Sequence, residues 1–173
     1  DAVQAQVSFD GQGQLLTDLS APVPSKNDRG ADYGMGAVSS IGKEWNEQAA
    51  AFAAYVTGKT LDEVAGIAVD EATKPAEADL ASSVTISIGG FQNAIAEAVA
   101  RAQPLGAQAG DELRLVTSNS MAAGNAPEGA AGMVETNVNI AAVTMNGDAI
   151  TSCVIDAVQA QVSFDGQGQL LTD

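Results

Sequence analysis

The sequence predicts an α+β fold, in which an antiparallel sheet has two main helices packed on one side. Two observations support this. Stretches in which apolar and polar residues alternate, the period of a half-buried strand, gather towards the two ends of the chain. Apolar residues with helical spacing occupy the middle. Because strands and helices are segregated, an α+β arrangement is favoured over alternating βαβ units.

The opening of the chain predicts a strand and a tight turn. Asp10-Gly11 is a turn signal, and residues 14–16 follow it as a short second strand. The apolar positions of the first strand alternate with polar ones, and they are Val3, Ala5, Val7 and Phe9. Residues 19–34, which hold two prolines, predict an irregular connection.

Two helices are expected in the middle of the chain. The first spans 40–57 and is closed by Gly58; its apolar face includes Trp45 and Phe52, which we interpret as core residues. The second has an apolar stripe from Ile88 and ends near Gln103-Pro104. Between them, Thr60 and Glu63 form a capping box for a short helical turn. A short strand is expected at 67–69, a strand or a strand-to-helix entry at 84–88, and a solvated acidic loop at 70–79.

The last third predicts further strands. We expect a strand from Leu113 to Thr117, a small-residue loop over 118–132, and a strand over 134–140. Asn146-Gly147 is a hairpin signal, and the return strand should bend or bulge near Asp156, where the parity of the apolar positions shifts.

The expected organisation is one compact domain of about one repeat. A strand segment, connection and two-helix part span 1–103, and a β-hairpin part spans 112–173. Residues 104–111 separate them as a linker or repeat boundary.

The strongest pattern is a duplication. Residues 1–18 and 156–173 are identical, at an offset of 155 residues. Two origins remain open: a tandem array with this period, or one segment deliberately placed at both ends of the chain.

A fold of one period has one place for the duplicated strand, so one copy is surplus. A surplus strand can pair with a neighbouring molecule by strand addition or swapping; donor and acceptor surfaces differ, so the contact is head-to-tail and propagates into a filament or surface array. The alternative is that the surplus copy is a frayed tail. The expected assembly residues are Val3, Ala5, Val7 and Phe9 in the first copy, and Val158, Ala160, Val162 and Phe164 in the second.

Composition narrows the function. The net charge of −15 argues against nucleic-acid binding through a basic face and against docking on an anionic membrane. The chain has no histidine, which removes the common triads and His-ligated metals, and its one cysteine excludes an internal disulfide. Cys153 lies in a strand run with Thr151 and Ile155 at alternate positions and is expected to be a small buried residue. No apolar run is long enough to span a membrane, and the acidic loop lacks calcium-site spacing. We expect a non-enzymatic, self-associating protein without a metal.

Serine-rich segments provide the alternative. Ser82, Ser83, Thr85 and Ser87 precede the second predicted helix, where hydroxyls and helix amides can hold a phosphate, or can simply cap the helix. Residues 82–99 resemble the helix-opening segment of the FMN-binding domain family of bacterial secreted lipoproteins and redox complexes. The resemblance extends loosely over 112–155 and 1–103 to repeated domains of Gram-positive surface lipoproteins. It implies that Thr85 takes the flavin-attachment position, that FMN is a possible cofactor, and that the protein is extracellular or at the cell surface.

Overall fold

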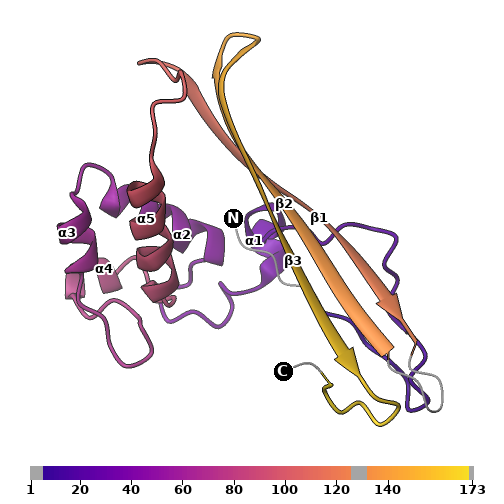
Figure 1. The fold of residues 1–173 in the computed structure, drawn as a ribbon. Helices are drawn as coiled ribbons and strands as arrows, with labels where there is room; N and C mark the ends of the chain where they lie inside the picture. The colour runs from indigo at the N-terminus through magenta and orange to yellow at the C-terminus, as the bar shows by residue number, and fades with distance from the viewer. Residues whose placement is uncertain (1–5, 126–131, 172–173) are drawn as a thin grey trace. The chain divides into compact units, whose positions relative to one another are not determined.

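The computed structural model describes residues 6–125 and 132–171. The chain divides into two compact units: a helical unit, Lys26–Pro104, and a sheet unit made of the two ends of the chain, up to Ser25 and from Leu105 onwards. Helices and a three-stranded antiparallel sheet are both present, so the α+β class is confirmed (Figure 1). The predicted linker 104–111 begins where the chain passes from the helical unit to the sheet unit.

The helical unit is built on an aromatic cluster. Phe91 packs on both Trp45 and Phe52, with ring centroids 6.1 and 6.0 Å apart, and the last two are buried. This confirms the core role predicted for Trp45 and Phe52. The elements are α1 (Lys26–Arg29), a 3-10 helix η1 (Gly30–Tyr33), α2 (Trp45–Val56), α3 (Leu61–Ala65), α4 (Ala78–Ala81) and α5 (Gly89–Arg101).

Both long predicted helices form, but α2 begins later than expected. Glu44 precedes it, and its amide donates to Glu47 Oε2 at 2.8 Å. The carboxylate of Glu44 accepts the amides of Met35 and Gly36 at 2.9 and 2.8 Å, which holds residues 35–44 in a loop. The backbone before Trp45 is therefore committed to this loop and does not continue the helix.

Two local predictions in this unit are wrong, and the strand alternative for residues 84–88 is excluded. Residues 26–33 are two short helices and not an irregular connection. Residues 67–69 make only one bridge, Val69 to Pro75. Residues 84–88 do not form a strand, although Val84, Ile86 and Ile88 are all buried. Their alternation reflects burial in the helical core and not pairing with a neighbouring strand, since Thr85 and Ser87 between them are less buried.

The sheet unit contains β1 (Glu112–Gly124), β2 (Gly132–Asn146) and β3 (Ala149–Phe164), in the order β1-β2-β3. The predicted hairpin is confirmed: β2 and β3 are joined through Gly147, whose φ is +56°. The loop predicted over 118–132 is wrong at 118–124, which belong to β1, and at 132, where β2 begins; its residues 126–131 lie outside the described residues. Pairing with β2 outweighs the weak strand preference of the small residues in β1.

The irregularity in β3 lies at Thr151 and not near Asp156. The register shifts between Thr144, which faces Ser152, and Met145, which faces Ile150, so Thr151 is the extra residue. Its hydroxyl donates to Asp111 Oδ2 at 2.5 Å. At Asp156 the ladder continues undisturbed. Residues 153–162 of β3 are exposed on both faces, so the alternation there does not indicate which side is buried.

Candidate assembly surface

One face of the sheet is apolar. Residues opposite one another on neighbouring strands share a face, and alternate residues of each strand belong to it. We call this the apolar face; from the register it includes Leu115 and Met121 of β1, Val134, Val138 and Ile140 of β2, and Val154, Val158, Ala160, Val162 and Phe164 of β3.

The second copy of the duplicated segment completes the sheet. Its first nine residues, 156–164, form the last part of β3 and pair with β2 without a break. The four predicted assembly residues of this copy, Val158, Ala160, Val162 and Phe164, all lie on the apolar face. Val158 and Val162 remain 56% and 42% exposed, whereas Phe164 is buried.

The first copy has the same sequence and a different structure. Residues 6–8 belong to no strand, and Phe9 makes a single bridge to Leu15. The Phe9 ring packs on Phe164, with centroids 4.8 Å apart. Val7 is half-buried, and the two other predicted residues, Val3 and Ala5, lie outside the described residues. The described part of the first copy therefore contacts the sheet that the second copy completes.

Two asparagines of the sheet unit hold the first copy and the residues that follow it. Asn119, buried on the apolar face, accepts the amide of Val23 at 2.8 Å and donates to its carbonyl oxygen at 2.6 Å. Just beyond the end of β1, Asn125 accepts the amide of Leu15 at 3.0 Å. No pattern in the sequence indicates these contacts, because an asparagine in a small-residue stretch is typical of a loop.

The two copies close with the same loop. In the first, Asp10 Oδ1 accepts the amides of Gln12 and Gln14 at 2.8 and 2.9 Å. In the second, Asp165 Oδ1 accepts those of Gln167 and Gln169 at 2.9 and 2.8 Å. The left-handed residues of the two loops, Gly13 and Gly168, have φ of +75° and +78°. We call this the Asp loop.

The Asp loop occurs a third time, in the helical unit. Asp70 Oδ1 accepts the amides of Ala72 and Lys74 at 2.9 and 2.8 Å, and the left-handed position is taken by Thr73, with φ of +58°. Only the aspartate is common to all three loops at matching positions, so residue identity could not reveal this recurrence.

A groove of about 400 Å³ lies between the two terminal Asp loops. Phe9, Phe164, Val134 and Leu170 supply apolar walls, and residues of both loops complete the lining. Both copies of the duplicated segment therefore contribute to a single surface.

The hydroxyls of the predicted flavin residues are hydrogen-bonded within the helical unit. The hydroxyls of Ser82 and Ser83 donate to the carbonyl oxygens of Asp79 and Leu80, and Ser87 hydrogen-bonds with Thr73. Helix α5 begins at Gly89, after Ile88, so none of the predicted hydroxyls caps it.

Thr85, at the predicted attachment position, is engaged by Gln48. The fully buried Gln48 accepts both the amide and the hydroxyl of Thr85 on Oε1, at 2.7 and 3.0 Å. FMN binding stays a prediction, which an absorption spectrum of the purified protein in the flavin bands tests.

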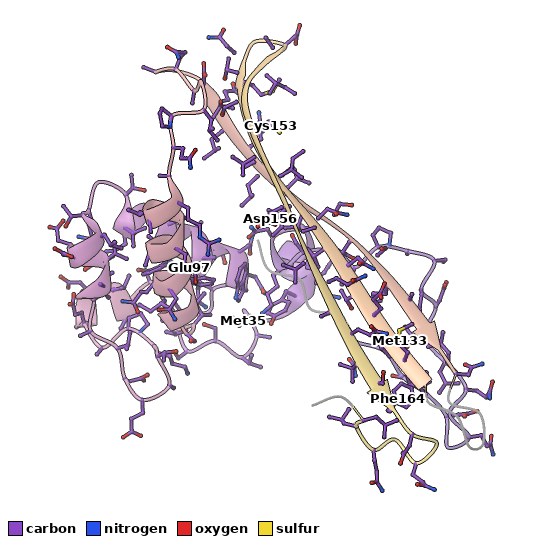
Figure 2. All side chains as sticks on the ribbon, viewed as in Figure 1. Met35, Glu97, Met133, Cys153, Asp156 and Phe164 are labelled. Carbon is purple, nitrogen blue, oxygen red and sulfur yellow. The ribbon has the colours of Figure 1, made fainter. Side chains whose placement is uncertain are left out.

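Cys153 is exposed, which corrects the expectation of a buried thiol (Figure 2). It lies in the part of β3 where both faces are open. Among residues 6–125 and 132–171, no group of three or more His, Cys, Asp or Glu side chains is placed to hold a metal. In the same ranges no helix is long and apolar enough to cross a membrane.

The carboxylates with lowered pKa values owe the shift mainly to local hydrogen bonds. The pKa of Asp111 is lowered, first by the hydroxyl of Thr151 and then by the amide of Gln108. The pKa of Glu63 is lowered mainly by the amide of Thr60, its partner in the predicted capping box, which is confirmed. Asp111 thus holds the start of β1 to β3, and Glu63 stabilises the first turn of α3. Neither carboxylate lines the groove.

No family model, curated protein or solved structure matches this chain.

Proposed function

We propose that this chain is a structural repeat unit that assembles head to tail through the duplicated segment. One observation carries the proposal: residues 156–164, which complete the sheet, have the same sequence as residues 1–9, which open the chain. We also propose an extracellular or cell-surface location, which rests on the family resemblance alone.

In a tandem array, the repeat boundary would run through the middle of a strand. Ile155 ends one sequence period and Asp156 starts the next, yet both belong to β3 and pair with consecutive residues of β2. Each sheet would then be completed by the opening of the following unit. Because each sheet takes its last strand segment from the next unit, neighbouring units would be joined by strand pairing as well as by the continuous chain.

Between separate molecules, the same pairing is strand exchange. Residues 1–9 of a neighbour offer β2 the same side chains as residues 156–164, so the exchange replaces each interaction with an identical one. The molecule's own second copy is attached to the hairpin and competes at an effective concentration of roughly millimolar. We therefore expect intact molecules to exchange strands weakly. Removing the second copy should leave β2 without a strand on that side, free to pair with the first copy of a neighbour.

The experiment is deletion of residues 156–173. The truncated chain has an unfilled place beside β2 and keeps its first copy, so we expect concentration-dependent oligomers in sedimentation velocity and filaments in electron micrographs. A peptide of residues 1–10 should bind the truncated chain and break these oligomers into single subunits.

Two controls make the result specific. A peptide with Val3 and Val7 both replaced by aspartate should not bind, because it would place charge on the apolar face. A chain lacking both 1–18 and 156–173 should take up the wild-type peptide but form no oligomers. If the chain lacking only 156–173 stays folded, monomeric and indifferent to the peptide, the proposal is wrong.

A further inference from the structure

The outer edge of β3 carries a self-complementary sequence. Strand β3 is an edge strand, paired with β2 on one side. Its residues 158–162 read Val-Gln-Ala-Gln-Val, which is the same in both directions. We propose that this edge is an isologous interface, at which β3 pairs antiparallel with β3 of a second copy of the chain across a twofold axis at Ala160.

The backbone has the phase that such pairing requires. The amide of Leu171 donates to the carbonyl oxygen of Ser163 at 2.8 Å, which places the polar groups of Ser163 on the outer edge. Along a strand these groups alternate sides, so those of Gln161 and Gln159 also point outwards. Pairing centred on Ala160 sets Gln159 opposite Gln161 of the other copy, and each such pair exchanges two hydrogen bonds.

The side chains match equally well. Val158 meets Val162 of the second copy on the apolar face, at positions that are not hydrogen-bonded, where side chains come closest. Both valines are substantially exposed in the single chain, at 56% and 42%. The pairing would join two three-stranded sheets into one and continue the apolar face across the axis.

This edge also lacks the usual protection against pairing. Residues 157–164 contain no charged residue and no proline, although the chain has a net charge of −15. The opposite edge strand, β1, carries Glu112 and Arg114, which form an ion pair at 2.8 Å. Within the described residues, the outer side of β3 is occupied only where 170–171 fold back on Ser163 and Phe164, which leaves 158–162 open.

A cysteine cross-link tests the register directly. In a chain with Cys153→Ser, the variant Ala160→Cys should form a disulfide-linked dimer under mild oxidation, because the two Cα atoms at the axis would lie about 4.5 Å apart. Ala157→Cys is the matched control, since residue 157 would face 163 and its two copies would be about 20 Å apart. Equal cross-linking at both positions, or none at Ala160→Cys, overturns the proposal.

Charge exchange tests the same contact without oxidation. Replacing Gln159 and Gln161 together with lysine should abolish the dimer in sedimentation equilibrium, and so should replacing both with glutamate. Mixing the two variants should restore a one-to-one dimer, because each lysine then faces a glutamate. A wild-type chain that is monomeric at all concentrations, or a mixture that remains unassociated, overturns the proposal.

The outcome is independent of head-to-tail assembly. Both tests leave residues 1–18 unchanged, so exchange of the first copy would continue if the edge did not pair. Conversely, dimers that form without cross-linking through Ala160→Cys would use another surface, including the first copy of a neighbour, and would exclude this interface.

Discussion

At the scale of single residues, Gln48 holds the helical unit together. Its side chain is fully buried; Nε2 donates to the carbonyl oxygen of Lys43 at 2.9 Å and to Ser39 Oγ at 3.2 Å, while Oε1 serves Thr85. One side-chain amide therefore connects α2 to the loop before it and to Thr85 in the segment before α5. No other side chain type of this size donates and accepts in this way.

We predict that Gln48→Ala lowers the free energy of unfolding by about 2–4 kcal/mol, because it leaves a cavity and strips the Thr85 amide of its partner. Urea denaturation followed by circular dichroism measures it. Gln103→Ala, at an exposed position, is the control and should change stability by less than about 0.5 kcal/mol. Equal effects of the two substitutions would contradict the role given to Gln48.

Glu63 links stability to pH. Its pKa in the folded protein lies below the ordinary value of about 4.5, chiefly because the amide of Thr60 donates to it. A lowered pKa gives stability that is present above the ordinary value and is lost as the pH falls through the folded one.

We predict that Glu63→Gln reduces the fall in Tm between about pH 6 and about pH 3, because the variant has no carboxylate to protonate at the helix start. Scanning calorimetry at both values measures the difference. Glu97→Gln, whose carboxylate forms an exposed ion pair with Arg101, is the comparison and should leave the fall nearly unchanged. The prediction fails if the Tm of the two variants falls by the same amount between these pH values.

At the scale of elements, one sequence adopts two structures. Val162 lies in β3 opposite Val134, whereas its sequence equivalent Val7 belongs to no strand. The difference cannot come from local propensity, since the surrounding residues are the same; it comes from the hairpin that delivers the second copy to β2.

We predict that Val162→Pro lowers the free energy of unfolding by about 1–3 kcal/mol, because it removes an amide that points towards β2. Val7→Pro, made in the same sequence context, should cost less than about 0.5 kcal/mol. Thermal unfolding of the two variants compares them directly. A larger effect at Val7 would mean that the first copy, and not the second, completes the sheet.

The elements that could be predicted are those with a clear helical spacing or turn signal. The helices around Phe52 and Phe91 and the hairpin at Gly147 follow from spacing and turn chemistry that the fold then uses. The extension of β1 through Ala122 and Ala123 could not be predicted, because only pairing with β2 makes small residues a strand. The residues of the candidate assembly surface could be named from the sequence but not placed, since two identical segments give no indication of which one pairs with β2.

At the scale of the whole molecule, charge opposes association. All copies carry a net charge of −15, so they repel one another at long range. The proposed contacts themselves are nearly uncharged, so salt should weaken the repulsion while leaving the contacts intact.

We predict that oligomers of the chain lacking 156–173 strengthen as the ionic strength rises from about 10 mM to about 150 mM, because the Debye length falls from about 30 Å to about 8 Å. Sedimentation velocity at the two salt concentrations measures the shift. Weaker association at the higher salt would show that opposite charges drive the contact.

The continuity of β3 across the period boundary has a consequence for biosynthesis. A ribosome making the proposed array would have to release nine residues of the next unit before the previous sheet could close. Folding would trail translation by that interval along the whole polymer. The final unit of such an array would have no following unit to supply this strand segment. It would need a dedicated terminal segment or a partner protein that donates a strand.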